Sequence, residues 1–281
     1  MCIRDRCSAT LINPRTVISA AHCIPETSTN GTTYNSVFML GNDLRDASQS
    51  LYGNLATLRP DKAVTAGSNI INEKYFENGG RGGSAYDLTI MSLDTPIYLD
   101  SFPSLPNSTP EVGDKVAIVG YGIIGYGSSG YDYVNPADEN LADYKRRSAE
   151  NKISGVFVDT GESINSLSIK FDKEDSSNFL PKEGFVSRGD SGGPIFLIDE
   201  SNSTIEYVFL GATCCGNTPG SNHGIYDSNA FFSSYYDLLD WINTNLPLQD
   251  VSSSGDGSYS LNQFGFNKLP FAMSASGYSS S

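Results

Sequence analysis

The hydrophobic positions of this 281-residue chain fall in short runs that are separated by polar turns. The runs are rich in Val, Ile, Leu and Thr and are four to six residues long, which is typical of β-strands. Before residue 108 they are ATLI (9–12), TVIS (16–19), SVFML (36–40) and LTIMSL (88–93). After residue 112 they are KVAIVG (115–120), ISGVFV (153–158), SLSIKF (166–171) and YVFLGA (207–212). The pattern predicts an all-β chain in two parts, joined by the turn-rich stretch LPNSTPEVGD (105–114).

The pattern changes near the end of the chain. A helical spacing of apolar residues predicts a helix that begins with Ser233 or Ser234 as its N-cap and stops at Pro247. Its apolar face consists of Tyr235, Leu238, Leu239, Ile242 and Leu246. Residues 247–281 are rich in Ser and Gly and have no clear period, so we expect a disordered tail or linker.

Charge and composition exclude several functions. The formal net charge of −14 argues against a nucleic-acid partner, because a phosphate backbone would be repelled. No segment approaches 18 uninterrupted apolar residues, so no transmembrane segment is expected. The chain has no dinucleotide fingerprint, phosphate loop or zinc-type cysteine spacing. We therefore expect no cofactor and no metal.

The stretch SRGDSGGPIF (187–196) surrounds Ser191 with glycines. It could be a tight loop and nothing more, or a nucleophile loop whose backbone N–H groups reach a developing oxyanion. A serine nucleophile needs a base, normally a histidine. His223 lies in the Gly/Pro-punctuated loop TPGSNHGIY, which predicts a solvated surface residue. His22 ends a strand-like run beside small residues that leave room for its ring, so it is the better candidate.

The chain contains five cysteines, and two pairs are informative. Cys7 and Cys23 bracket two apolar runs. A bridge between them would remove about 3 kcal/mol of unfolded-state entropy and would indicate an oxidising compartment; two core thiols are the alternative. Cys214 and Cys215 are adjacent and could form a vicinal disulfide. We favour two thiols, because the eight-membered ring would distort the peptide between them.

Three segments resemble, in chain order, the catalytic segments of the chymotrypsin/trypsin family of serine endopeptidases. They are CSATLINPRTVISAAHC (7–23), YDLTIMSLDTPI (86–97) and GDSGGPIF (189–196). VGDKVAIVGYG (112–122) resembles the strand that opens the second barrel of this family. FLGATCCG (209–216) and GIY (224–226) resemble the wall of its specificity pocket, and YYDLLDWINTNL (235–246) resembles its closing helix.

The resemblance implies an all-β fold of two antiparallel six-stranded β-barrels with a C-terminal helix. Residues 7–108 would form the first barrel, which carries His22 and Asp87 and is incomplete at its N-terminus. Residues 109–246 would form the second barrel, with Ser191 and the closing helix. Residues 1–6 read as a non-native leader. The chain is thus interpreted as an N-terminally truncated fragment of a secreted or periplasmic enzyme, without its signal peptide and first strand.

The family also implies a role for each catalytic residue. Ser191 would be the nucleophile, His22 its base, and Asp87 the carboxylate that orients His22. Cys7 and Cys23 would form a disulfide. The N–H groups of Gly189 and Ser191 would form the oxyanion hole. Asp190 would receive the N-terminal ammonium that zymogen activation frees, and without that partner its carboxylate is expected to be unpaired.

The specificity pocket and the partners follow from the same alignment of motifs. The pocket residues would be Phe185, Val186, Arg188, Thr213, Cys214, Cys215, Gly216 and Gly224. With Phe185 at the floor and Gly224 opposite, nothing pairs with Arg or Lys, so we expect cleavage after small or medium apolar residues. Expected partners are peptide or protein substrates and proteinaceous protease inhibitors, and the protein is expected to be a monomer.

The chain departs from the family at several points. Ser187 stands where relatives carry a half-cystine. Two insertions rich in Gly and Tyr, residues 72–86 and 122–144, are expected to be loops, and by resemblance they would border the cleft. One alternative function is a catalytically inactive homologue that binds without cutting, although such proteins usually lose the His or Ser. A second is an α/β-hydrolase esterase, whose G-x-S-x-G elbow also fits residues 189–193, but Pro194 and the strand-like IFLIDE follow instead of a helix.

Overall fold

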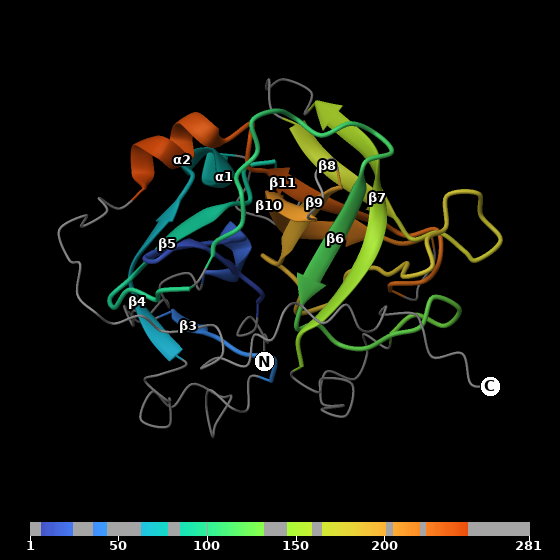
Figure 1. Cartoon of the computed structure of the whole chain (residues 1–281), viewed down its shortest axis with the longest axis horizontal. Coiled ribbons are helices and arrows are strands. Elements are labelled where there is room, and N and C mark those ends of the chain that lie inside the picture. Colours follow the sequence, from blue (N-terminus) through green and yellow to red (C-terminus); the bar gives the residue numbers. More distant parts are fainter. Residues whose placement is uncertain are drawn as a thin grey trace.

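The computed structural model describes most of the chain between Cys7 and Leu246. The described residues are 7–24, 36–43, 63–77, 85–99, 101–131, 145–158, 165–200, 205–219 and 223–246. The predicted leader (1–6) and the predicted tail (247–281) lie outside them. Within this part the chain is all-β with few helices, as the hydrophobic pattern predicts (Figure 1).

The first half of the chain forms an open antiparallel sheet in the order β1-β2-β5-β4-β3. The strands are β1 (Thr10–Asn13), β2 (Thr16–Ser19), β3 (Val37–Met39), β4 (Ala63–Ile71) and β5 (Thr89–Leu93). β1 and β2 form a hairpin, and β2 pairs with β5 from Thr16↔Ser92 to Ser19↔Thr89. This register places the end of β2 beside the start of β5, so the residues flanking these two ends become neighbours.

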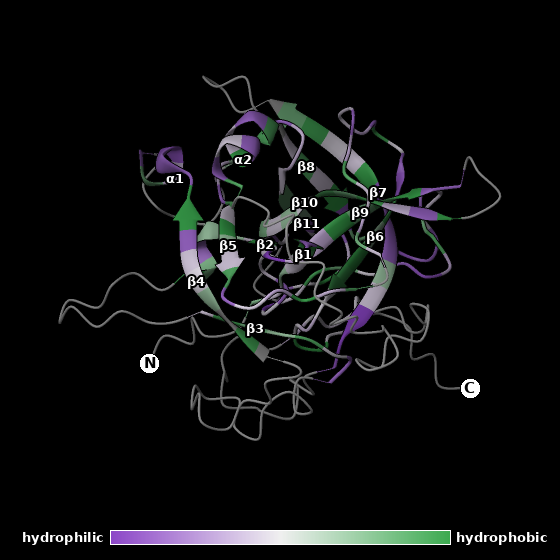
Figure 2. Cartoon of the chain, turned by 60° about the vertical axis from the view of Figure 1, so that its left-hand side comes forward, coloured by the Kyte–Doolittle hydropathy of each residue, from purple (hydrophilic) through white to green (hydrophobic). Residues whose placement is uncertain are grey.

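The second half forms a closed barrel in the order β10-β11-β8-β7-β6-β9. Its strands are β6 (Lys115–Gly120), β7 (Arg147–Val158), β8 (Asn165–Lys170), β9 (Pro194–Asp199), β10 (Glu206–Asn217) and β11 (Asn229–Ser234). The barrel closes where β6 pairs with β9, at Val116↔Leu197. Figure 2 shows hydrophobic stretches of β6 and β9 in the middle of this half.

The sequence predicts a complete second barrel and a first barrel that is incomplete at its N-terminus, and a closed barrel is found in the second half only. In the described part of the first half, β1 and β3 are the edges of the sheet and do not pair with each other. Closure would need a ladder between these edges or an additional strand between them. What is observed is one six-stranded barrel and one five-stranded open sheet.

The helices also differ from the sequence prediction. α1 (Glu73–Glu77) lies within the first insertion, which the sequence predicts to be a loop. α2 (Leu239–Asn245) begins five residues after Ser234, and its N-cap is Leu238. Ser233 and Ser234 instead end β11, where they pair with Ala212 and Gly211. The two serines that the sequence predicts at the start of the helix therefore belong to the ladder between β10 and β11.

The main hydrophobic core joins the two halves. It draws on the sheet, the barrel and both helices, which lie together at one end of the molecule (Figure 1). Its members include Ile18, Ile90, Phe209, Tyr235 and Ile242. A second cluster fills the barrel and a third packs on the other face of the sheet. The sheet and the barrel thus share one apolar interface, and the ends of β2 and β5 are held against the barrel.

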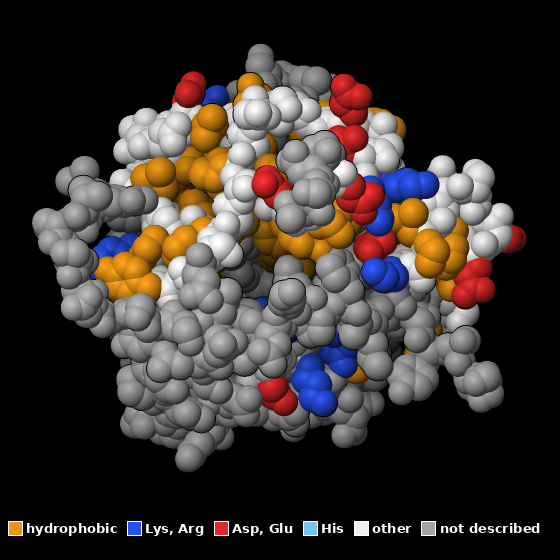
Figure 3. All heavy atoms as spheres, viewed as in Figure 1, with side chains coloured by type: hydrophobic (Ala, Val, Ile, Leu, Met, Phe, Trp, Pro, Cys, Tyr) orange, Lys and Arg blue, Asp and Glu red, His pale blue; other side chains and the backbone are white. Residues whose placement is uncertain are grey.

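The surface carries ion pairs on the barrel side. Glu150 on β7 lies between Lys115 and Lys182, each 3.2 Å from one of its carboxylate oxygens. On the face drawn in Figure 3, acidic and basic side chains lie close together over the barrel half. None of the helices in the described part is long and apolar enough to cross a membrane.

Candidate active site

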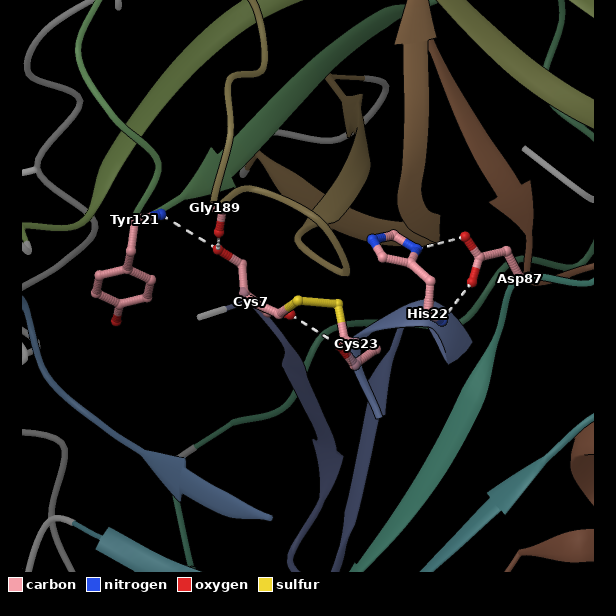
Figure 4. Close-up of a disulfide and its surroundings, with 8 residues drawn as sticks. Cys7, His22, Cys23, Asp87, Tyr121 and Gly189 are labelled. Carbon is pink, nitrogen blue, oxygen red and sulfur yellow. Dashed lines mark hydrogen bonds and ion pairs between the residues drawn. A yellow bond between two sulfur atoms is a disulfide. The ribbon is translucent and has the colours of Figure 1, made fainter. Parts of the chain in front are cut away.

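His22 lies in a single 3-10 turn, Ala21–Cys23, that directly follows β2. Cys23 is joined to Cys7 by a disulfide with a Cα–Cα distance of 6.1 Å, so this turn is tied to the residues that precede β1 (Figure 4). The sulfur atoms of both cysteines lie close to the His22 ring. Because these sulfur atoms are bonded to each other, they are not thiolates and do not make this cluster a metal site.

Asp87 holds His22 at two points. Its carboxylate is fully buried, two residues before β5. The Oδ1 atom accepts the backbone N–H of His22 at 2.9 Å, and Oδ2 lies 2.6 Å from the ring Nδ1. A carboxylate oxygen accepts here, so the proton of the ring lies on Nδ1 and Nε2 is left as the acceptor. Nε2 has no hydrogen-bond partner among the described residues.

The barrel adds a further contact to this pair. Ser233 on β11 donates its hydroxyl to the backbone carbonyl of Asp87 at 3.2 Å. Ser233 is fully buried, and it lies 146 positions from Asp87 in the sequence. The carboxylate is therefore fixed from the sheet side by His22 and through its own backbone from the barrel side.

The loop that carries Ser191 packs against the residues just before His22. The carbonyl of Ser191 accepts the N–H of Ser8 at 2.8 Å. A Cβ on Gly192 would lie only 2.1 Å from Ser19 Oγ and 2.8 Å from Ala20 N, so only glycine fits this close approach. The structure thus brings Ser191 and His22 into one region. No hydrogen bond joins the Ser191 hydroxyl to His22 among the described residues.

The N–H groups of this loop divide into two sets. Those of Asp190, Gly192 and Gly193 are bonded to the carbonyls of Ser187, Thr213 and Asp190 at 2.7 to 3.0 Å. Those of Gly189 and Ser191 find no acceptor among the described residues. These two are the groups that the resemblance assigns to the oxyanion hole, and they are free to receive a ligand atom.

The prediction that the Asp190 carboxylate is unpaired is wrong. It accepts the N–H of Gly122 at 2.7 Å, the N–H of Ser187 at 2.7 Å and the Ser187 hydroxyl at 3.1 Å. Ser187 also donates to the carbonyl of Ile123 at 2.6 Å. Burial raises the pKa of the Asp190 carboxyl above its ordinary value, and the three donors oppose that rise.

A cavity lies beside Asp190 and opens to solvent. Its empty volume is about 440 Å³, solvent at its mouth included, and its lining includes Ile118, Arg147, Phe185 and Val186. Two of the predicted specificity residues thus border this cavity. Phe185 also stacks on Phe171, with ring centroids 5.4 Å apart.

The remaining predicted pocket residues lie elsewhere. Thr213, Cys214, Cys215 and Gly216 lie on β10, with a register shift between Thr213 and Cys215. Cys214 is buried, Cys215 is half-buried, and both are thiols, as expected. Arg188 is half-buried in the loop before Gly189, and its carbonyl accepts the N–H of Ile123.

The second insertion packs against the turn that holds Gly224. Tyr131 donates its N–H to the carbonyl of His223 at 2.9 Å, and the two rings are stacked. Gly127 accepts the N–H of Tyr226 at 2.8 Å. His223 is therefore half-buried against this loop, not a solvated surface residue as predicted. The described part of the insertion, up to Tyr131, borders the segment predicted to wall the pocket.

Sequence reasoning misses several residues of this region. Ser8, Gly122 and Ser233 all contact the loop or Asp87, and only the GYG pattern at residues 120–122 carries a local signal of close packing. Glu183 is missed as well: it is buried, accepts the Asn151 amide at 2.9 Å, and burial raises its pKa to about 7. An isolated serine or glutamate in a sequence has no pattern that marks such a contact.

An all-β fold in which a buried Asp holds a half-buried His beside a Gly-Asp-Ser-Gly-Gly loop is typical of a serine hydrolase. The sequence model of the Trypsin family matches residues 2–242. The chain therefore belongs to the trypsin family and is a serine endopeptidase, which confirms the resemblance found in its motifs.

Curated relatives agree with this assignment. The chain is 26% identical over 244 residues to thrombin-like enzyme acutin of Deinagkistrodon acutus, covering 85% of each chain. It is equally similar to thrombin-like enzyme BjussuSP-1 of Bothrops jararacussu. It is 24% identical to the snake venom serine protease Haly-2 of Gloydius brevicauda, covering 84% of this chain and 76% of the relative.

Proposed function

We propose that the protein hydrolyses peptide bonds by acyl transfer through a triad of Ser191, His22 and Asp87. The observation that carries the proposal is the two-point bond between Asp87 and His22 beside the docked Ser191 loop. With its proton held on Nδ1, His22 offers Nε2 as the base. Alignment of the Ser191 hydroxyl with Nε2 is expected when substrate binds, because catalytic hydrogen bonds often tighten only in the complex.

The steps follow from the positions of these groups. Ser191 Oγ attacks the scissile carbonyl while Nε2 of His22 takes the hydroxyl proton. His22 then gives this proton to the leaving amine, and water hydrolyses the acyl-enzyme by the reverse sequence. The Asp87 carboxylate stabilises the imidazolium that forms in each half-reaction. The unbonded N–H groups of Gly189 and Ser191 would stabilise the oxyanion, a contribution of about 3 kcal/mol or more per donor.

The end of β10 is the proposed docking site for the substrate backbone. β9 pairs with β10 only as far as Ala212, and beyond Thr213 that side of β10 carries no strand in the part of the chain that is described. An extended peptide can add to such an edge through main-chain hydrogen bonds. We propose a pocket without an acidic partner for Arg or Lys, and hence cleavage after small or medium apolar residues.

The proposal extends to the division of the chain into barrels, to the location of the enzyme and to its activation. We propose that the open sheet belongs to a first barrel over residues 7–108 and that residues 109–246 form the second. We propose that the enzyme is secreted, in line with the venom relatives and with a disulfide beside the active site. Asp190 is proposed to receive an activation ammonium, which would have to displace one or more of its present donors.

Replacement of Ser191 by alanine tests the proposal. Turnover of a peptide substrate is expected to fall by about 10⁴- to 10⁶-fold, because the nucleophile and its base act as one unit. A fluorophosphonate should label Ser191 in the wild-type protein, as located by mass spectrometry, and should not label the variant. The matched control is Ser168→Ala, which removes a buried hydroxyl of β8 and should keep both activity and labelling.

The alternative is an inactive homologue that only binds. It would show neither labelling nor turnover in the wild-type protein, with the fold intact by circular dichroism. Peptidase activity that survives in Ser191→Ala would contradict the proposed mechanism.

A further inference from the structure

Ser8 uses every hydrogen-bonding group that it has. It follows Cys7, is 2% exposed, and lies in the short segment before β1. Its N–H donates to the Ser191 carbonyl at 2.8 Å, and its carbonyl accepts the Ser19 hydroxyl at 2.9 Å. Its hydroxyl donates to the Gly189 carbonyl at 3.1 Å and accepts the N–H of Tyr121 at 3.2 Å.

These bonds connect three parts of the molecule at one point. Cys7 and Ser19 belong to the sheet half, Tyr121 directly follows β6 of the barrel, and Gly189 and Ser191 belong to the loop of residues 187–193, here called the nucleophile loop. Figure 4 shows Tyr121 and Gly189 joined by dashed lines through the side chain that follows Cys7. The same view places this linkage and the His22–Asp87 pair on either side of the disulfide.

We propose that Ser8 is a positioning residue for the oxyanion hole. The inference rests on the proposed function, because it assigns to Ser8 the orientation of the Ser191 N–H, one of the two proposed oxyanion donors. Ser8 touches neither the substrate nor the reacting atoms in this proposal. It acts by fixing the two carbonyls that flank the peptide group between Asp190 and Ser191.

The geometry of the loop explains why such a clamp is needed. Gly189 has φ +99°, a backbone conformation that glycine adopts readily and that no side chain of its own restrains. The N–H of Ser191 belongs to the peptide group that lies between the carbonyls of Gly189 and Ser191. Ser8 holds the carbonyls on both sides of this peptide group, and the N–H of Gly193 holds its own oxygen, the Asp190 carbonyl. Rotation of the Ser191 N–H is therefore restrained by buried hydrogen bonds at all three carbonyls.

The loop has further anchors, and one of them acts on the same peptide group: the carbonyl of Asp190, which shares a peptide group with the Ser191 N–H, accepts the N–H of Gly193 at 2.7 Å. The Asp190 carboxylate is bound by Gly122 and Ser187, and Gly193 is bonded to Asp190 and Thr213. None of these bonds fixes the Gly189 carbonyl. Among the described residues, the Ser8 hydroxyl is the donor that reaches it.

Ser8→Ala is the direct test. It leaves the Gly189 carbonyl and the Tyr121 N–H without their partner. The value of kcat is expected to fall about 10- to 100-fold, since a small displacement of an oxyanion donor loses much of its effect. KM should change by less than about 3-fold, because the β10 edge is untouched. Ser8→Thr keeps the hydroxyl and should retain most of the wild-type kcat, whereas Ser8→Gly is a second variant without it.

Ser168→Ala separates positioning from a general loss of stability. Ser168 is also 2% exposed, and its hydroxyl bonds to Ser154 Oγ and to the Gly155 carbonyl, on the barrel and away from the nucleophile loop. This variant should be destabilised as Ser8→Ala is, with kcat unchanged. A wild-type kcat in Ser8→Ala, or an equal fall in Ser168→Ala, would overturn the assignment.

Hydrogen exchange gives a measurement that does not depend on turnover. In Ser8→Ala made in the Ser191→Ala background, the amide of Tyr121 should exchange faster while the amides of β7 and β8 stay protected. Unchanged exchange at Tyr121 would contradict the proposal even if the wild-type protein proved inactive. A wild-type protein without peptidase activity would count against the proposed function, and the exchange result would still decide whether the Ser8 hydroxyl holds the segment that follows β6.

Discussion

The five-stranded sheet and the six-stranded barrel are built from similar runs of Val, Ile and Leu, but among the residues that the structure describes the sheet is open, with two edges, and the barrel is closed. Two barrel strands, β7 and β10, are 12 residues long, and register shifts within them accompany the closure. In the sheet, β1, β2 and β3 have only three or four residues each. The barrel is therefore held by its own ladder, whereas the sheet depends on the shared core, the disulfide and a few polar contacts.

The proposed catalytic residues come from both halves of the molecule, the sheet and the barrel. His22 and Asp87 come from turns at the ends of sheet strands, and Ser191 comes from the loop before β9 of the barrel. Ser8 and Ser233 are polar contacts that cross from one half to the other. The comparison indicates that the barrel supplies a fixed frame for the proposed nucleophile, while the proposed base is held in place by local crosslinks.

The largest effect on kcat is expected from Asp87→Asn, which changes the carboxylate of the sheet half that holds His22. An amide in this place would turn a donor toward Nδ1 and favour the wrong ring tautomer, so kcat should fall about 10⁴-fold while the fold remains. Steady-state kinetics and thermal unfolding measure the two effects. Asp94→Asn, at an exposed site just beyond β5, is the control and should leave kcat unchanged. A loss below about 10-fold in Asp87→Asn would count against the proposed triad.

A smaller effect is expected from removing the disulfide with Cys7→Ser and Cys23→Ser together. The free energy of unfolding should fall by about 3 kcal/mol, since the crosslink restricts the unfolded chain. Hydrogen exchange should show faster opening of β1 and β2 and little change in β6 and β9. The control is Cys215→Ser, which changes a thiol of the barrel that forms no disulfide. Equal loss of protection in both halves would refute the contrast between sheet and barrel.

The smallest effect concerns a buried carboxyl of the barrel half. Glu183 accepts the Asn151 amide and the N–H groups of Asp172 and Leu180, and burial raises its pKa to about 7. Because its pKa is raised, Glu183 binds its proton more tightly in the folded protein than in the unfolded chain. Its contribution to stability is therefore complete below about pH 4.5 and is lost as the pH rises to about 7.

Glu183→Gln should remove this dependence. The free energy of unfolding of the variant should vary less than that of the wild type between pH 4.5 and 7, by about 2 to 3 kcal/mol. Urea unfolding at several pH values measures the difference, and Glu206→Gln at the exposed start of β10 is the control. Parallel curves for wild type and Glu183→Gln would show that this carboxyl titrates normally.

The sequence alone determined the all-β class, the family and most of the strands, but not β4 or β11. A strand run such as KVAIVG and a motif such as GDSGGPIF are local patterns, because side-chain alternation and glycine-flanked turns depend only on residues that are adjacent in the chain. The small residues before His22 and the adjacent Cys23 are local in the same way, and they are sufficient to select His22 as a candidate. Asp87 is selected only through the resemblance of its segment, YDLTIMSLDTPI, to the trypsin family.

Only the tertiary structure decided which polar groups meet across the two halves. Local preference assigns Ser233 to a helix cap, because Ser favours that place, but β10 and β8 draw it into β11, where its hydroxyl reaches Asp87. Asp190 is expected from the sequence to be unpaired, yet Gly122, 68 positions away, donates to it. Ser8 and Gly189 are 181 positions apart. Such contacts depend on how the sheet packs against the barrel. A hydrogen bond between residues far apart in the chain has no local sequence pattern, so neighbouring residues cannot predict it.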